Sequence, residues 1–228
     1  LSDPLFTRQG QYLIPTEKAL SVNRALGEPL ESLRQLLSPI DFAPKFCDQT
    51  FTIATTDYAM QTILPFALPR IYQEAPNVAF EFLPLQHEHL REQLTYGRAD
   101  LAICRPTQAI EPLQYETLGR VGVLCLLSKQ HPLANEEMCL DDYLKFPHAM
   151  IAISDGVKSL IEQALEDKPK RRMVLRAYHL EAALAIVDTM PLIITVPADL
   201  AYLVSERYDL TVKPLPFHFT PFDYSMIW

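Results

Sequence analysis

The stretch FTIATTDYAMQTILPFALPRIYQEAPNVAFEF (51–82) decides the fold of this chain. Its opening FTIA (51–54) is a short apolar run, which predicts a buried strand, and TTDY (55–58) follows as a turn into a helix. Pro65 and Pro69 bend the front of that helix, because proline supplies no N–H. One face of the helix is apolar at helical spacing: Met60, Ile63, Leu64, Ala67, Leu68 and Ile71. Alternating apolar residues then indicate a second strand: Val78, Phe80 and Phe82.

The same alternation of strand and helix continues after residue 82. Leu90 and Leu94 define a helix that Gly97 can close in the left-handed conformation. LAIC (101–104) reads as the next strand, and VGVLCLLS (121–128) as a further one. Strands joined by helices through short links imply a parallel sheet with right-handed crossovers.

The second half repeats this pattern with different residues. We predict strands at 148–153, 173–177, 192–196, 211–215 and 222–228, and helices at 157–166, 179–190 and 197–208. Two consecutive α/β units in one chain predict two Rossmann-like lobes that face a cleft. Ligands in such folds bind at the carboxyl ends of the strands.

A separate helix is predicted upstream of both units, at 16–38, with Thr16 as its N-cap. Gly27 and Pro29 weaken or kink it near the middle. Its apolar stripe lies ahead of the main core and needs a partner, and a second copy of the chain is the one we expect. The dimerisation residues would be Val22, Leu26, Leu30, Leu33 and Leu37. Residues 39–48 form a linker.

Composition excludes several classes of protein. The 228 residues carry 20 Lys and Arg against 28 Asp and Glu, a net charge of -8, which does not fit a surface that grips the phosphates of DNA. Only six residues are glycine, and neither GxGxxG nor GxxxxGK[ST] occurs, so a standard nucleotide fold is not expected. No apolar run reaches 18 residues and no signal peptide precedes the first strand, so we expect no membrane partner.

The four cysteines form no motif. Cys47, Cys104, Cys125 and Cys139 are too widely spaced for CxxC or a Cys/His cluster, so neither a zinc site nor a redox motif is supported. We expect no metal and no cofactor. A reduced chain in the cytoplasm is the simplest interpretation.

Several segments in register resemble the LysR-type transcriptional regulators. DPLFTRQGQYLIPTEKA (3–19) resembles the end of their winged helix-turn-helix and the start of their linker helix, and 55–82 resembles the start of their effector-binding domain. TTDY (55–58) and PFDYSMIW (221–228) look most like the subgroup of nodulation, leucine-responsive and naphthalene-degradation regulators. Further segments in the family's order are LTYGRADLAI (94–103), SKQHPLA (128–134) and ITVPADLA (194–201).

The resemblance implies an α/β fold of two lobes, of the type II periplasmic-binding-protein kind, that binds a small effector. It divides the chain into a winged-helix remnant (1–15), a dimerisation helix with its linker (16–48), lobe I (49–124 with 218–228) and lobe II (125–217). The chain would pass between the lobes near 122–127 and 215–221. Family members begin with a basic DNA-binding domain and continue past Trp228 with a helix, so we expect a fragment trimmed at both ends.

Candidate effector-binding residues in lobe I lie where predicted strands end. Thr56 and Tyr58 begin a helix, whose N-terminal N–H groups attract anions. The resemblance implies that this turn contacts the effector. Plain N-capping by Thr56 or Asp57 is the alternative, and we favour it for Asp57. Arg105 can fork onto a carboxylate, or it can be a surface residue paired with a glutamate. Gln86 is a weaker candidate of the same kind.

Lobe II supplies three more candidates. Ser154 follows the strand 148–153, and Thr195 lies late in the strand 192–196. His179 opens a helix, and the resemblance places a matching histidine in the effector pocket of the naphthalene regulators. A lone histidine at a helix start is more often structural.

Three other patterns favour ordinary explanations. Ser154, Asp155 and His179 could be imagined as a hydrolase triad, but no GxSxG elbow supports one. In HEH (87–89) the two histidines do not share a helix face, so a solvated surface is expected rather than a metal site. One basic run is interpreted as a solvated loop: Lys168, Lys170, Arg171 and Arg172.

The sequence therefore predicts the effector-sensing and oligomerising part of a LysR-type regulator. An organic anion would bind between the lobes, and DNA would be bound through a winged helix mostly absent from this chain. A free solute-binding protein would need an export signal and no dimer helix, and an enzyme would need a catalytic constellation. The segment DPLFTRQ (3–9) opposes both alternatives.

Overall fold

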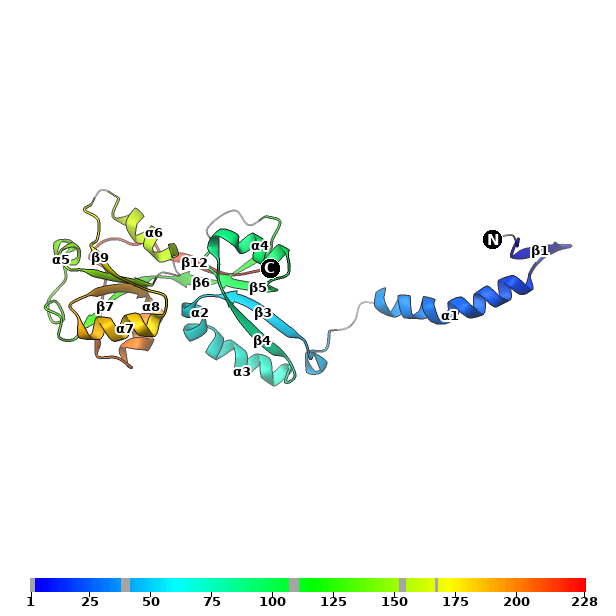
Figure 1. Ribbon diagram of the computed structural model, residues 1–228, viewed down its shortest axis with the longest axis horizontal. Helices are drawn as coiled ribbons and strands as arrows, with labels where there is room; N and C mark the ends of the chain where they lie inside the picture. The colour runs from blue at the N-terminus through cyan, green and yellow to red at the C-terminus, as the bar shows by residue number, and fades with distance from the viewer. Residues whose placement is uncertain (1–2, 38–41, 107–110, 152–154, 167) are drawn as a thin grey trace. The chain divides into compact units, whose positions relative to one another are not determined.

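The computed structural model describes all residues except 1–2, 38–41, 107–110, 152–154 and 167, and it divides into two compact units (Figure 1). The first unit is Leu1–Pro44 and the second is Lys45–Trp228. A short 3-10 helix, η1 (Pro44–Phe46), lies where they meet in the sequence.

The first unit consists of a hairpin and a helix. Strands β1 (Phe6–Gln9) and β2 (Tyr12–Pro15) pair antiparallel, and Gly10 turns the chain between them with a φ of 64°. Helix α1 (Glu17–Leu37) follows, and the Thr16 hydroxyl accepts a hydrogen bond from the Ala19 N–H at 3.1 Å, so the predicted N-cap is confirmed. Pro29 lies inside α1, where it removes one backbone hydrogen bond without ending the helix.

Lobe I of the second unit is built on a five-stranded sheet in the order β4-β3-β5-β12-β6. Strand β3 pairs parallel with β4 and β5, whereas β12 pairs antiparallel with β5 and β6. The elements of lobe I are β3 (Thr50–Thr55), α2 (Asp57–Thr62), α3 (Leu64–Glu74), β4 (Ala79–Pro84), η2 (His87–His89), α4 (Leu90–Thr95), β5 (Leu101–Cys104), β6 (Tyr115–Val121) and β12 (Phe222–Ile227).

Lobe II is built on a second five-stranded sheet in the order β11-β7-β10-β8-β9. Strand β8 pairs parallel with β9 and β10, whereas β7 pairs antiparallel with β10 and β11. Its elements are β7 (Val123–Ser128), α5 (Leu140–Lys145), β8 (His148–Ile151), α6 (Asp155–Ala164), β9 (Met173–Ala177), α7 (Leu180–Thr189), β10 (Ile193–Pro197), α8 (Ala198–Ser205) and β11 (Leu210–Lys213).

The chain passes between the two sheets at Gly122 and over residues 214–221, so lobe I is assembled from two separated segments and lobe II from one continuous segment. Figure 1 shows the lobes side by side with β6 and β12 at their junction. One buried apolar cluster includes Ile53 and Ile103 of lobe I together with Leu126 and Leu184 of lobe II. Because this core is shared, the strand ends of the two lobes are held against each other.

Three local predictions need correction. The helix expected over 60–71 is two helices, α2 and α3, which are separated at Ile63. Pro65, near the start of α3, has no N–H to donate to the carbonyl four residues earlier, so one continuous helix would lose a backbone hydrogen bond there. The single strand expected at 121–128 is two strands in different sheets, separated at Gly122. Pro197 is the N-cap of α8 rather than its first residue.

Among the described residues, no helix is long and apolar enough to span a bilayer.

Candidate functional site

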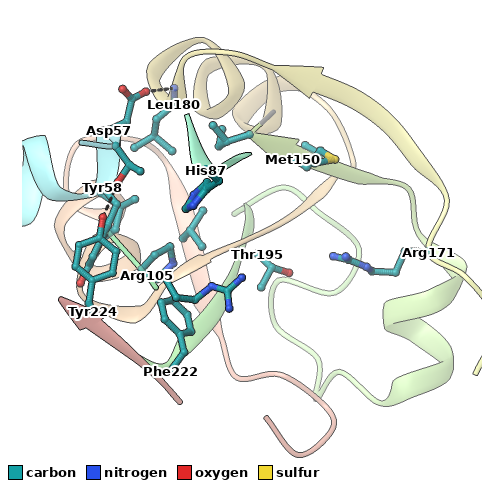
Figure 2. Close-up of a pocket in the computed structure, with 16 residues that line it drawn as sticks. Asp57, Tyr58, His87, Arg105, Met150, Arg171, Leu180, Thr195, Phe222 and Tyr224 are labelled. Carbon is teal, nitrogen blue, oxygen red and sulfur yellow. Dashed lines mark hydrogen bonds between the residues drawn. The ribbon is translucent and has the colours of Figure 1, made fainter. Parts of the chain in front are cut away.

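A cavity opens where the strands of the two lobes end toward each other (Figure 2). Counted with the open space at its mouth, it encloses about 960 Å³. Its walls come from both sheets and from the first residues of three helices. The lining residues are Thr56, Asp57, Tyr58, His87, Arg105, Ala149, Met150, Ile151, Arg171, Leu180, Thr195, Val196, Pro197, Leu200, Phe222 and Tyr224.

The wall from lobe I centres on a pair of hydroxyls. The Thr56 and Tyr224 oxygens lie 2.7 Å apart, and the Tyr224 O–H donates to the Ile103 carbonyl at 3.3 Å. Because that bond uses the tyrosine proton, the Thr56 O–H donates to Tyr224, and Thr56 Oγ1 keeps its lone pairs for a donor. The Tyr58 and Tyr224 rings meet edge to face at 5.0 Å, and burial raises the pKa of Tyr224.

Two hydrogen bonds cross from lobe I to lobe II beside the cavity. The Tyr58 O–H donates to Asp199 Oδ2 at 2.9 Å, and burial, followed by this bond, raises the pKa of Tyr58. The Leu180 N–H donates to Asp57 Oδ2 at 3.3 Å (Figure 2). The N-capping expected of Asp57 at its own helix is not seen, because the N-cap of α2 is Thr56, without a side-chain cap bond. Asp57 instead accepts from the first N–H of α7, in the other lobe.

Arg105 brings a cationic side chain to the cavity directly after β5. Its guanidinium carbon lies 6.0 Å from the centre of the Phe222 ring, which is cation–π distance. Its Nε is buried without a hydrogen-bond partner, and burial lowers the pKa of the guanidinium. No carboxylate among the described residues forms an ion pair with it.

Arg171 supplies a second cationic side chain, from lobe II. Its Nη1 donates to the Tyr143 hydroxyl at 3.4 Å, and that hydroxyl lies 3.1 Å from Thr195 Oγ1. Figure 2 shows Arg105 and Arg171 pointing toward Thr195 from opposite sides. The solvated loop predicted for the basic run is therefore wrong for Arg171, which is half-buried, whereas Lys168, Lys170 and Arg172 are exposed.

The predicted site residues divide into three groups. Thr56, Tyr58, Arg105 and Thr195 all line the cavity. Gln86 and His179 lie outside the lining, and Ser154 lies outside the described residues.

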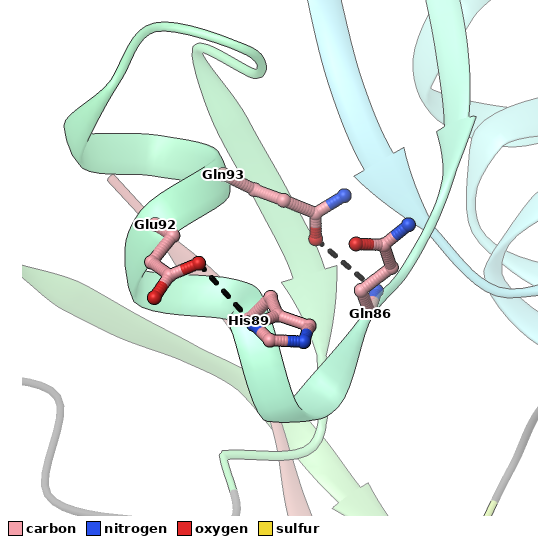
Figure 3. Close-up of polar contacts among 4 residues, drawn as sticks. All are labelled: Gln86, His89, Glu92 and Gln93. Atoms are coloured by element: carbon pink, nitrogen blue, oxygen red, sulfur yellow. Dashed lines mark hydrogen bonds and ion pairs between the residues drawn. The ribbon is translucent and has the colours of Figure 1, made fainter.

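Gln86 and His179 miss the cavity by one position each. Gln86 is exposed, and its N–H donates to the Gln93 side-chain oxygen at 3.1 Å (Figure 3). The next residue, His87, lines the cavity in its place. His179 is the exposed N-cap of α7, and the following residue, Leu180, is the one that faces inward.

Other lining residues were missed because they break the rule that ligands meet the carboxyl ends of strands. Phe222 and Tyr224 come from the first half of β12, which runs antiparallel to β5, so the start of β12 lies beside the end of β5. Arg171 precedes β9 and reaches the cavity from that strand's amino end. The sequence could have pointed to Phe222 and Tyr224 if the strand over 222–228 had been predicted as antiparallel, because the start of such a strand lies at the edge of the sheet where ligands bind.

The histidines of HEH (87–89) have different surroundings. His87 lines the cavity, whereas His89 Nδ1 lies 3.2 Å from Glu92 Oε2 on the exposed side of α4 (Figures 2 and 3). Among the residues that the structure describes, no group of three potential ligands gathers that could hold a metal ion.

A two-lobed α/β domain whose strand ends surround an amphipathic cavity is a small-molecule-binding domain. Residues 48–228 match the family described as LysR substrate binding domain, so the chain belongs to this family, whose members are the effector-binding parts of LysR-type transcriptional regulators. The α/β fold of two lobes predicted from the sequence is thereby confirmed.

Comparison with known proteins gives the same family. The chain is 28% identical to the HTH-type transcriptional activator NagR of Ralstonia sp over 233 residues, covering 100% of this chain and 76% of NagR. A solved transcriptional regulator from Vibrio parahaemolyticus is 83% identical, with a TM-score of 0.76 over 81% of this chain and 86% of that one. The effector-binding domain of QuiR, solved with shikimate, shares the fold at 15% identity and a TM-score of 0.65, over 78% and 86% of the two chains.

Proposed function

We propose that this chain senses a small organic anion in the cavity between its lobes and that binding controls transcription through the DNA-binding part of a LysR-type regulator. One observation carries the proposal: half-buried Arg105 faces a cavity whose lining is mostly uncharged, and no carboxylate among the described residues forms an ion pair with it. A desolvated guanidinium gains most from a carboxylate, which it can bind through two parallel hydrogen bonds. The QuiR domain, which has the same fold, was solved with the small molecule shikimate.

The organisation of the regulator follows the family resemblance. We assign 1–15, which holds the β1–β2 hairpin, to the DNA-binding part, and 16–48 to the dimerisation helix and linker. We move the boundary between the lobes from 124 to 122, because Val123 begins a strand of the lobe II sheet, and we propose lobe I as 49–122 with 218–228 and lobe II as 123–217. A cytoplasmic location suits a regulator of DNA, and all four cysteines are free thiols, as expected in a reducing compartment.

Self-association through α1 is the second part of the proposal. Leu26 and Leu30 are 47% and 53% exposed in the single chain, and Val22 is half-buried. An exposed apolar stripe on a helix is stabilised by a second copy that covers it. The side chains of Leu33 and Leu37 lie outside the described ones. An effector can then shift the assembly only by its different affinities for two subunit arrangements.

A thermal-shift screen of organic acids against their uncharged amides tests the sensing role. Acids that bind the folded chain should raise its melting temperature by mass action, and the amides should not. Arg105→Gln should abolish the shift, whereas Arg70→Gln, at an exposed position on α3, should keep it. Shifts caused equally by acids and amides, or an unchanged response of Arg105→Gln, would contradict the proposal.

A further inference from the structure

The two lobes hold each other by two kinds of contact, which differ in what they fix. The apolar cluster that contains Ile103 of lobe I and Leu126 of lobe II favours contact between the lobes, but the hydrophobic effect has no direction and does not select one alignment. A hydrogen bond requires its donor and acceptor to meet within a narrow range of distance and angle. Side-chain hydrogen bonds between the lobes therefore select one alignment among those that the core permits.

Asp57 of lobe I places its carboxylate at the N-terminus of a helix in lobe II. Its Oδ2 accepts from the Leu180 N–H, the first of α7, at 3.3 Å (Figure 2). Within the described part of the chain, the N-cap residue His179 makes no side-chain bond that caps α7, so the carboxylate from the other lobe supplies an acceptor for this helix. The positive end of the helix dipole also favours a carboxylate there.

Tyr58 makes a second bond across the junction, again from lobe I to lobe II. Its O–H donates at 2.9 Å to Oδ2 of Asp199, which lies in the first turn of α8. Burial raises the pKa of Tyr58, so the hydroxyl keeps its proton at neutral pH and remains a donor. The edge-to-face contact with Tyr224 holds the ring in place, so a displacement of lobe II would stretch this bond rather than be followed by the tyrosine.

Both bonds lie toward one end of the cavity. Asp57, Tyr58 and Leu180 line that end, and Figure 2 shows Arg171 on the far side. Arg105 and Arg171 come from different lobes, so the separation of their guanidinium groups depends on how the lobes are aligned. Whatever fixes that alignment also fixes the shape of the cavity.

We propose that the Asp57–Leu180 and Tyr58–Asp199 bonds form an interlobe latch, which selects one alignment of the lobes and thereby sets the separation of the groups that face the cavity from opposite lobes. The latch goes beyond the proposed function and does not rest on it, since it concerns how the lobes hold each other whatever the cavity binds. A ligand or subunit contact that favours another alignment must break these bonds, and it does so only by the difference in its affinity for the two alignments.

The chain carries its own reporters for a distance measurement between the lobes. Its single tryptophan, Trp228, directly follows β12 of lobe I. Cys139 of lobe II is exposed, whereas Cys104 and Cys125 are buried, so a thiol-reactive dansyl dye labels Cys139 once Cys47 is replaced by serine. Time-resolved energy transfer from the tryptophan to the dye gives the distribution of distances between the lobes. An excess of unlabelled Trp228→Phe chain keeps the measured transfer within one chain when copies associate.

Asp57→Ala combined with Tyr58→Phe should broaden this distribution or move its mean, while the circular dichroism spectrum stays that of the folded chain. The share of chains outside the parent distribution should rise by about tenfold for each lost bond, because each bond has a charged acceptor. Asp57→Asn keeps an acceptor oxygen and should have a smaller effect than Asp57→Ala. Tyr72→Phe combined with Glu74→Ala, at exposed positions of α3 in the same lobe, is the matched control and should give the parent distribution.

A double-mutant cycle separates a latch from a general loss of packing. Tyr58→Phe and Asp199→Ala remove the same bond, so the two changes together should broaden the distribution no more than either one alone. Effects that add in the double variant would show that the two side chains act independently, which contradicts their part in the latch.

The parent distribution in a folded Asp57→Ala and Tyr58→Phe chain would overturn the latch and show that the apolar core aligns the lobes by itself. If that double variant does not fold, Tyr58→Phe decides alone, because it removes one oxygen and keeps the ring, and an unchanged distribution in it overturns the latch as well. No ligand is added in these measurements. Failure of the latch therefore leaves the thermal-shift prediction standing, and failure of organic acids to bind leaves the latch standing.

Discussion

His148 ties the stability of lobe II to pH. Its side chain is completely buried, and its Nε2 donates to the Tyr143 carbonyl at 2.7 Å. Burial, assisted by the charge of Arg171, lowers its pKa to about 4, against 6.5 for an exposed histidine. The unfolded chain therefore binds a proton at a pH where the native chain does not, so stability falls as the pH drops from about 6.5 to about 4.

The expected loss between pH 7.5 and pH 5 is about 2 kcal/mol in the free energy of unfolding. Urea unfolding at the two pH values measures it. His148→Gln should lower stability at pH 7.5 and shrink the difference between the two values, whereas His218→Gln, at an exposed position, should leave the difference unchanged. An equal pH dependence in both variants would show that His148 does not titrate in this way.

At the level of single residues, the sequence predicts strand-end positions better than side-chain directions. Thr56, Arg105 and Thr195 were found because a polar residue at or near the end of a buried strand has few places to point. Gln86 and His179 fail by one position, because the path of a loop decides which of two neighbours turns inward. Hydrogen bonds such as Asp57 to the Leu180 N–H join residues 123 positions apart, and no local pattern encodes them.

At the level of elements, the end of α4 depends on one glycine. Gly97 has a φ of 66°, the left-handed conformation in which glycine closes a helix. An added Cβ would meet no atom within 4 Å, so the cost of a substitution is purely that of the backbone. Gly97→Ala should therefore lower the free energy of unfolding by about 1 kcal/mol, and Gly97→Asn by less.

Gly119→Ala in β6 is the matched control for that prediction. A Cβ there also meets open space, but the backbone of Gly119 is not left-handed. Chemical unfolding should show no loss for Gly119→Ala. Equal effects at the two glycines would mean that the conformation of Gly97 has no role in stability.

The boundaries of elements were predicted wrongly where no apolar pattern marks them. β6 is an edge strand whose residues are exposed except Val121, so it carries no apolar alternation and was not predicted. The prediction of a single strand over 121–128 was wrong for the opposite reason. Val121 and Val123 are both buried, so the apolar run continues although the two residues belong to different sheets. The central parallel strands β3, β5, β8 and β10 were predictable because both of their faces are covered.

At the level of the whole molecule, the two-lobed architecture followed from the repeated strand–helix order, together with the resemblance to a known family. A cleft between the lobes was predicted with them, but its full lining was not, because the lining depends on how the lobes meet. The shared core around Leu126 and Ile103 and the bonds of Asp57 and Tyr58 across the lobes fix that meeting.

Helix α1 carries the remaining prediction, self-association of the chain. In sedimentation velocity the parent chain should form a dimer or a larger oligomer, because burial of Leu26 and Leu30 against a second copy removes their exposed apolar surface from water. Leu26→Glu combined with Leu30→Glu should weaken association by about a hundredfold or more, since each places an unpaired charge in the interface. Ser21→Glu adds the same charge at an exposed polar position on the opposite face of α1 and should leave the oligomer intact. A parent chain that sediments as a monomer at high concentration would contradict the dimerisation helix. It would leave effector binding untouched, because every residue that lines the cavity lies in the other compact unit.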